Sequence, residues 1–532
     1  MRRLLLFAAL ITLAVPIAAR GATSDLQRFF GYDRPATYGV VKTSLMVATR
    51  DGTKLGCFLY RPATADGIPA SGKFPGLIVE YLPYWTADDV LAGVDSQANY
   101  YVSHGYVALH CTPRGSGLSE DVWHGWLSAI ENQDNYDIIE WLAHQPFCTG
   151  KIGQEGESYG GMTSYRVASL RPPNLVAIAP QQAFSSQYLE QGYYGGIRGT
   201  ADPFWAIVAG MGLGSPTMLP YPQLGDWLEH PLLDDYWLQI DIWDDYAQIK
   251  VPILGFGGWL DLFQDGMARN YIGLKSHAWL IDGPWGHGNT FQTGVTRGTT
   301  LAWFDHWLLG LRSAPMPPSR VMSYEMPGGP WRAYSDWPPK NVGSVTLALN
   351  TDATIGKAAS AGSNSYIADP TAGVNANTNS TSLTFTSAAL GGDLLLTGAG
   401  SVDLIATLTD PTGVLGASGS NVVETNFVFH LYDVAPDGTS TNVTQGYLKA
   451  SHRLSHSYPT VLDLDVPTSY TIPLWHTDWR FLAGHRLKLV LAAGDQSTGL
   501  SGAPAPLQPI PPLTVIVATG NGGSVMKLPV SQ

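Results

Sequence analysis

The stretch Gly156-Glu157-Ser158-Tyr159-Gly160-Gly161 has the residue types and spacing that most directly indicate chemistry. An apolar run at 151–155 precedes it, and helical spacing follows over 162–170. Glycines around a serine allow a tight turn from a strand into a helix, which lifts the hydroxyl above the sheet and beside a helix N-terminus. This pattern predicts that Ser158 is a nucleophile. The alternative is a serine in an ordinary glycine-rich turn.

A serine hydroxyl is a weak nucleophile without a base, so the turn predicts an acid and then a histidine farther along the chain. Asp261 follows the expected strand 251–256, and His287 follows the expected strand 277–281. In this arrangement Asp261 orients the imidazole, and His287 takes the proton of Ser158 and returns it to the leaving group. Asp265 and Asp282 are the alternatives for the acid. A loop histidine with a structural role is the alternative for His287.

An oxyanion that develops during acyl transfer needs preorganised hydrogen-bond donors. We expect one donor to be the backbone N–H of Tyr159, the residue after the nucleophile. The second donor should come from the loop after the expected strand 74–81, which contains Leu82-Pro83-Tyr84-Trp85. Considered by itself, Tyr84 is a packed aromatic residue.

The elements that must position these residues follow two different patterns. From about 43 to 311, short β-type runs alternate with helical patterns, which is typical of βα units on a mostly parallel sheet. We expect an α/β-hydrolase core over 25–183 and 251–311, and an aromatic-rich helical cap, 184–250, inserted between core strands. An ordinary crossover is the alternative for the cap. The expected core elements are strands 44–49, 54–60, 74–81, 106–111, 151–155, 175–180, 251–256 and 277–281 and helices 132–144 and 299–309.

Helical periodicity almost vanishes after a linker at 312–319. Short strands recur between Gly, Asp, Thr and Pro turns, which predicts an all-β domain over 319–532, a sandwich of the jelly-roll type. The low-complexity stretch 360–382 is expected to be a long loop. The expected strands are 344–349, 393–396, 402–408, 427–434, 470–474 and 486–492.

The N-terminus has the composition of a secretory signal. Arg2 and Arg3 precede an apolar run from Leu4 to Ile17, and Ala18-Ala19 offers a cleavage site. We therefore expect a signal peptide over 1–19 and a secreted or periplasmic protein, with an uncleaved membrane anchor as the alternative. No later stretch is long and apolar enough to span a bilayer. The formal net charge of −13 over 532 residues argues against nucleic acid and anionic membrane as partners.

The chain has three cysteines, so at least one thiol is free. Cys111 ends one expected strand and Cys148 precedes another, which separates them by about 15 Å if the strands are parallel neighbours. A disulfide needs Cα atoms within about 7 Å, so we expect none between Cys111 and Cys148. No metal or other cofactor is expected, because the histidines lack ligand-like spacing with carboxylates. These histidines are His104, His110, His124 and His144.

Several further motifs carry a family resemblance, and together they extend over nearly the whole chain after 19. They are Arg114-Gly115-Ser116-Gly117-Leu118-Ser119-Glu120, 141–161, Arg171-Pro172-Pro173, 258–261, 283–287, 303–308, Trp331-Arg332, Trp337-Pro338-Pro339 and Gly484-His485-Arg486-Leu487. The chain resembles the cocaine esterase and X-Pro dipeptidyl-peptidase-like group of α/β-hydrolases. The resemblance implies a hydrolase core, a helical cap and a jelly roll. It also implies that Tyr84, in Pro83-Tyr84, donates its hydroxyl to the oxyanion.

Departures from the group bear on the substrate. Thr112 and Glu155 stand where the group has an aspartate and an aromatic residue. In its α-amino-acid ester hydrolases, carboxylates bind a substrate ammonium at the positions of Leu262, Phe263 and Thr86 here. A free α-amino group is therefore not expected, and Trp85, Leu262 and Phe263 favour an apolar or aromatic acyl group.

We expect a small-molecule ester as the substrate. The alternative is an amide, cleaved by a dipeptidyl-peptidase-like enzyme or a β-lactam side-chain acylase. A catalytically inactive protein that binds glycan through its jelly roll is a third hypothesis.

Overall fold

The structure is a computed structural model. It describes residues 23–84, 88–199, 227–288, 290, 294–370, 380–413, 415, 423–495 and 512–531. The expected signal peptide, 1–19, and Trp85 lie outside these residues. Within them, none of the helices combines the length and the apolar character that crossing a membrane requires.

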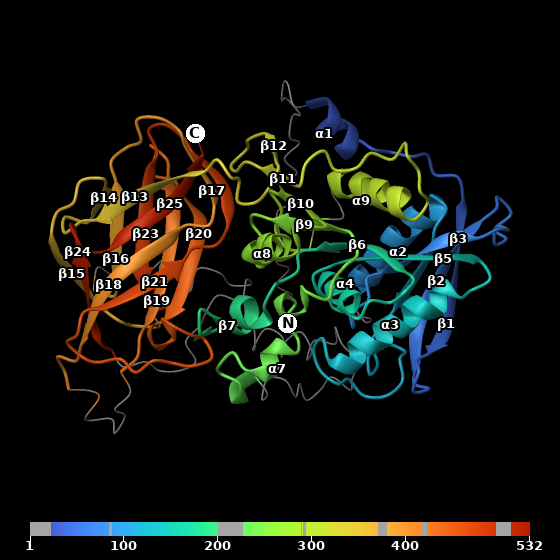
Figure 1. Ribbon diagram of the computed structural model, residues 1–532, viewed down its shortest axis with the longest axis horizontal. Coiled ribbons are helices and arrows are strands. Elements are labelled where there is room, and N and C mark those ends of the chain that lie inside the picture. The colour runs from blue at the N-terminus through green and yellow to red at the C-terminus, as the bar shows by residue number, and fades with distance from the viewer. Residues whose placement is uncertain are drawn as a thin grey trace, which may run out of the picture.

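The first half of the chain builds one ten-stranded sheet (Figure 1). Its order is β1-β2-β4-β3-β5-β6-β9-β10-β11-β12, parallel from β4 to β11 and antiparallel at both ends. The strands are β1 Gly39–Ala48, β2 Lys54–Ala63, β3 Phe74–Val79, β4 Val107–Cys111, β5 Cys148–Glu157, β6 Leu175–Gln181, β9 Ile253–Gly258, β10 Ala278–Gly283, β11 Val321–Tyr324 and β12 Trp331–Tyr334. All eight strands expected in the core are therefore confirmed.

Helices cover both faces of this sheet, because its central strands are apolar on both sides. Leu77 and Val79 of β3 face the cluster that includes α1, α2 and α9, whereas Ile78 faces the cluster that includes α3, α4 and α8 (Figure 1). The helices are α1 Thr23–Phe30, α2 Asp88–Ser103, α3 Ala129–Ala143, α4 Tyr159–Ser169, α8 Gln264–Leu274 and α9 Gly294–Trp307. The side chain of Ser128 caps the N-terminus of α3 by accepting from the N–H of Glu131.

A disulfide joins two neighbouring strands near the sheet edge. Cys57 and Cys111 stand directly opposite each other in the antiparallel pair β2–β4, with their Cα atoms 4.1 Å apart. Cys148 is a buried free thiol, so the prediction of no Cys111–Cys148 bond is confirmed. Sequence reasoning missed the Cys57–Cys111 bond because it treated β4 only as a parallel strand.

The described residues between β6 and β9 form an insertion whose strand β7 lies next to the second domain (Figure 1), and their aromatic side chains join the core cluster that includes α3, α4 and α8. The rings of Tyr188 and Tyr193 stack with centroids 5.2 Å apart, and Trp237 packs edge-on against both. This insertion contacts the second domain where the N–H of Lys449 donates to the carbonyl of Gly195. Its described elements are η1 Tyr188–Gly192, β7 Tyr193–Tyr194, β8 Ile197–Arg198, α7 Asp235–Leu238 and η3 Trp243–Asp245.

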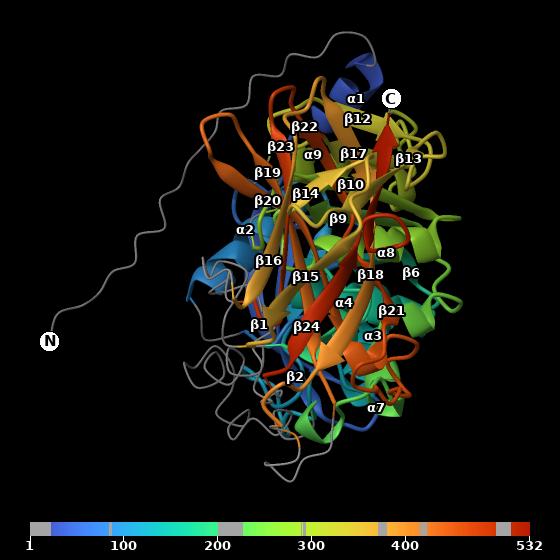
Figure 2. The ribbon, with the colours of Figure 1, turned by 90° about the vertical axis from the view of Figure 1, so that its left-hand side faces the viewer.

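The second domain is rich in β structure, and in Figure 2 it faces the viewer. Its strands pair antiparallel except for β14 with β16. They are β13 Gly343–Leu349, β14 Thr354–Gly356, β15 Gly362–Ile367, β16 Ser382–Ser387, β17 Leu394–Gly398, β18 Ser401–Thr409, β19 Asn426–Val434, β20 Ser440–Lys449, β21 Thr468–Pro473, β22 Thr477–Phe481, β23 Arg486–Ala492, β24 Thr514–Thr519 and β25 Val525–Ser531. The short helix η4, Ala450–His452, follows β20.

One sequence expectation for this half is wrong. The stretch 360–382 is not one loop, because 362–367 forms β15, which pairs with β24 and buries Tyr366. β11 and β12 follow the expected linker at 312–319 and extend the first sheet, whereas the second sheet begins at Gly343. Trp331-Arg332, which the resemblance linked to the jelly roll, therefore lies in a strand of the first sheet.

Candidate active site

Ser158 occupies the sharp turn between β5 and α4. Its backbone has φ 58° and ψ −116°, a conformation that non-glycine residues rarely adopt and that recurs at functional turns. Glycine is required around it: a Cβ on Gly160 would lie 2.2 Å from Oε2 of Glu80, and one on Gly161 would lie 2.4 Å from the carbonyl of Gln181. The glycines therefore allow strand and helix to meet closely enough to present Ser158 at the end of the sheet.

The structure brings Ser158, His287 and Asp261 into one hydrogen-bonded chain. Nε2 of His287 lies 2.9 Å from Oγ of Ser158, and Nδ1 lies 2.6 Å from Oδ1 of Asp261. Asp261 follows β9 and His287 follows β10, so all three residues stand at the carboxyl ends of parallel strands. The side chain of Asp261 is fully buried, while the imidazole is 29% exposed.

The alternative acids, Asp265 and Asp282, lie in other environments. Asp265 accepts hydrogen bonds from the backbone N–H of His476 at 2.9 Å and pairs with Arg269. Asp282 is completely buried, and burial together with the charge of Asp261 raises its pKa well above the usual range. Asp261 is therefore the carboxylate that contacts His287.

Opposing effects act on the pKa of His287. Burial lowers it, but the charge of Asp261, its hydrogen bond, and the charge of Glu157 outweigh burial, so the pKa lies above its ordinary value of 6.5. The environment thus stabilises the imidazolium relative to the neutral ring, as a base that must hold a proton during the reaction requires.

The two candidate oxyanion donors belong to residues that contact each other. Tyr159 is the first residue of α4, and its ring packs edge-on against that of Tyr84 with centroids 5.9 Å apart. Burial raises the pKa of the Tyr84 hydroxyl far above its usual range, so this group remains a protonated donor at any physiological pH. The hydroxyl of Tyr159 donates to both carboxylate oxygens of buried Glu131, at 2.8 and 2.7 Å, which fixes the orientation of its side chain.

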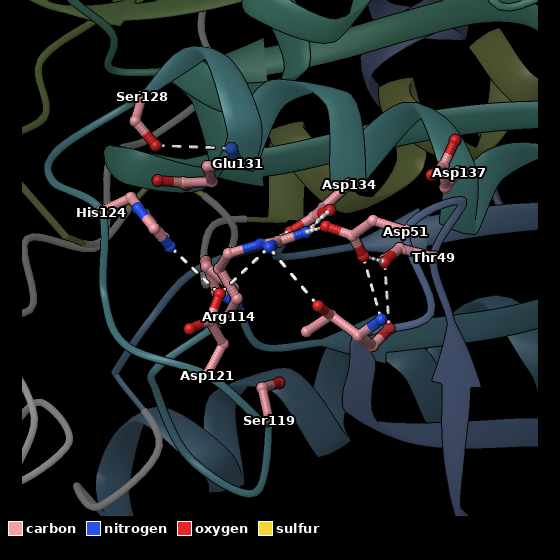
Figure 3. Close-up of polar contacts among 12 residues, drawn as sticks. Thr49, Asp51, Arg114, Ser119, Asp121, His124, Ser128, Glu131, Asp134 and Asp137 are labelled. Carbon is pink, nitrogen blue, oxygen red and sulfur yellow. Dashed lines mark hydrogen bonds and ion pairs between the residues drawn. The ribbon is translucent and has the colours of Figure 1, made fainter.

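Arg114 joins three segments of the catalytic domain (Figure 3). Its buried guanidinium binds Asp134 of α3 with two hydrogen bonds of 2.6 and 2.7 Å and reaches Asp51 at 3.0 Å and Asp121 at 3.1 Å. The loop that carries Arg114 leads to Trp126, whose ring packs 4.7 Å from that of Tyr159. The guanidinium group of arginine is planar and always charged, so it can bind carboxylates from three segments of the chain at once.

The structure describes two of the side chains expected to bind substrate, Phe263 and Leu262. Phe263 is 2% exposed, and its ring centroid lies 5.5 Å from that of His287 and 5.7 Å from that of Phe184. Leu262 is half-buried and packs against the core. Trp85 and Thr86 lie outside the described residues. The first two therefore give the region after Asp261 an apolar character.

Sequence reasoning missed a group of buried carboxyls beneath the serine. Oε1 of Glu80 accepts the backbone N–H of Glu157 at 2.9 Å, and Oε2 of Glu155 accepts from Gln181 at 3.2 Å. Burial and the charge of Glu157 raise the pKa of Glu80 to about 8. The signal available in the sequence was the presence of two glutamates, Glu155 and Glu157, at the end of a run predicted to be a buried strand. Among the described residues, no group of three or more His, Cys, Asp or Glu side chains is arranged to hold a metal ion.

The sheet order, the turn at Ser158 and its contacts define a hydrolase with an N-terminal catalytic domain and a C-terminal β-rich domain. Residues 51–289 match the X-Pro dipeptidyl-peptidase (S15 family) model, and 315–521 match the X-Pro dipeptidyl-peptidase C-terminal non-catalytic domain. The chain belongs to the cocaine esterase and X-Pro dipeptidyl-peptidase-like family, as the resemblance predicted.

Particular relatives span nearly the whole chain. Cocaine esterase of Rhodococcus sp. is 26% identical over 544 residues, which cover 86% of this chain and 91% of the relative. A CocE/NonD family hydrolase from Staphylococcus aureus superimposes with a TM-score of 0.77 at 21% identity, covering 94% of this chain and all of the other. An α-amino acid ester hydrolase superimposes with a TM-score of 0.73 at 19% identity, covering 94% and 98%. These two likenesses show the shared fold.

Proposed function

We propose that this hydrolase is a serine esterase in which Ser158 is the nucleophile, His287 the general base and Asp261 the orienting acid. The chain of contacts from Ser158 through His287 to Asp261, at 2.9 and 2.6 Å, carries the proposal. An activated serine needs a base within hydrogen-bond reach and a third group that orients the base, and each has that geometry here.

The reaction has two halves. Oγ of Ser158 attacks the ester carbonyl while its proton moves to Nε2 of His287, and the oxyanion accepts from the N–H of Tyr159 and the hydroxyl of Tyr84. The tetrahedral intermediate collapses to an acyl-enzyme, and the imidazolium gives its proton to the departing alkoxide. Water then attacks the acyl-enzyme with His287 again as base, which releases the acid and restores the Ser158 hydroxyl.

We infer that the acyl group is apolar or aromatic and belongs to a small molecule. Phe263, packed between His287 and Phe184, supports this inference because it makes the surroundings of the base hydrophobic. Leu262 and Phe263 also replace the carboxylates that would bind a substrate ammonium.

Amide cleavage is the second candidate, because both matched family models belong to X-Pro dipeptidyl-peptidases. The same residues would act, with an amine as leaving group. Comparing kcat/KM for an ester and an amide of one aromatic acyl group separates the candidates: a preference for the amide would overturn the esterase proposal.

We also propose that the protein is exported to the periplasm or beyond the cell. The Cys57–Cys111 disulfide supports this, because such bonds persist mainly in oxidising compartments. N-terminal sequencing of protein recovered from the native host should give a chain that starts near Arg20. An intact Met1 on membrane-free protein would contradict the proposal.

Replacement of the serine tests the central assignment. Ser158→Ala should abolish both hydrolysis of p-nitrophenyl esters and covalent labelling by a fluorophosphonate. Ser169→Ala, at the last residue of the same helix, is the matched control and should retain both. Labelling that persists in Ser158→Ala would place the nucleophile elsewhere. A series of p-nitrophenyl esters of graded chain length would then define the acyl preference.

A further inference from the structure

Gln182 lies just beyond β6 and contacts the loop that carries His287. Its side chain is completely buried. Nε2 donates to the carbonyl of Gly286 at 2.8 Å, and Oε1 accepts from the N–H of Gly288 at 2.9 Å. One side-chain amide therefore binds both residues that flank His287.

This bridge matters because glycines stand on both sides of the histidine. Gly288 adopts φ 83°, and glycine has more backbone freedom than any other residue. Without an external restraint, the peptide groups around His287 can rotate and move the imidazole relative to Ser158. The fixed donor and acceptor of a primary amide satisfy one carbonyl and one N–H at once and hold this loop in a single conformation.

Gln182 is itself held firmly. Its backbone N–H donates to the carbonyl of Phe256 at 2.8 Å, which ties it to β9, and its φ of 46° directs the side chain away from the path of β6. A Cβ on Gly258 would lie 3.1 Å from Nε2 of Gln182, so the glycine leaves room for the amide. On the other side of the loop, Glu157 accepts from the N–H of Thr290 at 2.8 Å.

We propose that Gln182 is a positioning residue that fixes the imidazole of His287 against Ser158 by clamping Gly286 and Gly288. The inference rests on the proposed function, because it assigns Gln182 a role only through His287 as base. Loss of the clamp should slow proton transfer without changing how substrate binds.

Gln182→Met keeps the length and volume of the side chain and removes both hydrogen bonds. A small misplacement of a reacting group costs up to about 100-fold, so kcat should fall by about 10- to 100-fold while KM changes little. Gln187→Met is the matched control, since Gln187 is equally buried and its amide bonds to Gln191 instead. The control should retain the kcat of the unmodified protein.

A double-mutant cycle with His287→Ala distinguishes positioning of the base from any other role. If Gln182 acts through His287, adding Gln182→Met to His287→Ala should change the residual rate less than 2-fold. A further loss of 10-fold or more in the double variant would overturn the inference. Near-normal activity of His287→Ala alone would instead overturn the proposed function, which keeps the two failures apart.

A second variant tests the proposal even if Gln182→Met does not fold. Gln182→Asn keeps an amide and suits a left-handed backbone, but it is one methylene too short to reach both glycines. Its melting temperature should stay close to that of the unmodified protein, while its kcat should fall by at least about 10-fold. A folded Gln182→Asn protein with an unchanged kcat would refute the clamp.

Discussion

Tyr84→Phe gives the sharpest test of how the oxyanion is stabilised. The change removes one hydroxyl and keeps the ring, which packs edge-on against Tyr159 with centroids 5.9 Å apart. The hydroxyl oxygen is buried, and burial raises its pKa, so it stays protonated and able to donate. Its absence should therefore affect mainly the charged transition state.

The magnitude follows from what one oxyanion donor contributes. Losing such a donor typically lowers kcat by about 100- to 1000-fold, or about 3–4 kcal/mol. KM should change little, because the ground-state carbonyl carries little charge. The free energy of unfolding should change by about 1 kcal/mol or less, which is no more than the usual net contribution of one hydrogen bond.

The assay is steady-state hydrolysis of a p-nitrophenyl ester, with thermal unfolding measured on the same samples. Tyr81→Phe is the matched control: it removes another buried hydroxyl three residues earlier in the same segment, one that donates to the carbonyl of Glu131 at 3.5 Å. The control should lose some stability and retain its kcat. If Tyr84→Phe has a kcat within 3-fold of the unmodified protein, Tyr84 is a packed aromatic residue and the second donor is a backbone N–H.

Three other perturbations have definite expected outcomes. Because neutral His287 is the active form and its pKa is raised, kcat/KM should increase with pH around a midpoint above 6.5. Asp261→Asn should lower this midpoint, since the effect of burial on the His287 pKa then dominates. An unchanged midpoint would argue against the pairing of Asp261 with His287. Replacing both Cys57 and Cys111 with Ser, which opens a loop of 54 residues, should lower the free energy of unfolding by about 4 kcal/mol in a denaturant titration, and no change would contradict the bond. Gly160→Ala would place a Cβ 2.2 Å from the Glu80 carboxyl and should lower the free energy of unfolding by about 1–3 kcal/mol in the same titration. An unchanged denaturation midpoint would show that the Glu80 side chain moves freely.

The part of the site that the sequence predicts well depends on local patterns. Ser158, Asp261 and His287 each follow an apolar run, and the carboxyl ends of parallel strands meet at one edge of a sheet. Strand order need not be known for that argument. This is why the sequence alone places together three residues spread over more than a hundred positions, which contact one another at 2.9 and 2.6 Å in the structure.

The features that were missed depend on contacts between distant segments. The Cys57–Cys111 bond requires the antiparallel register of β2 with β4, which no local pattern encodes. Gln182 has nothing in its own surroundings that points to a loop more than a hundred residues later. The membership of β11 and β12 in the first sheet was missed for a similar reason. These strands are short and follow a proline-rich stretch, so they resemble the strands after them, although β11 pairs with β10 and β12 pairs with β11.

The position of β11 and β12 has a practical consequence for recombining this protein with its relatives. A chain that ended near 319 would leave β10 as an open parallel edge, which is a template for aggregation. It would also lack Glu325 and would strip Asp265 of His476, its partner in the second domain. A chimaera that exchanges the β-rich domain should therefore be joined between Tyr334 and Gly343. Its partner domain must supply equivalents of Arg480, which pairs with Glu325, and of His476, which supports Asp265 in the helix after Asp261.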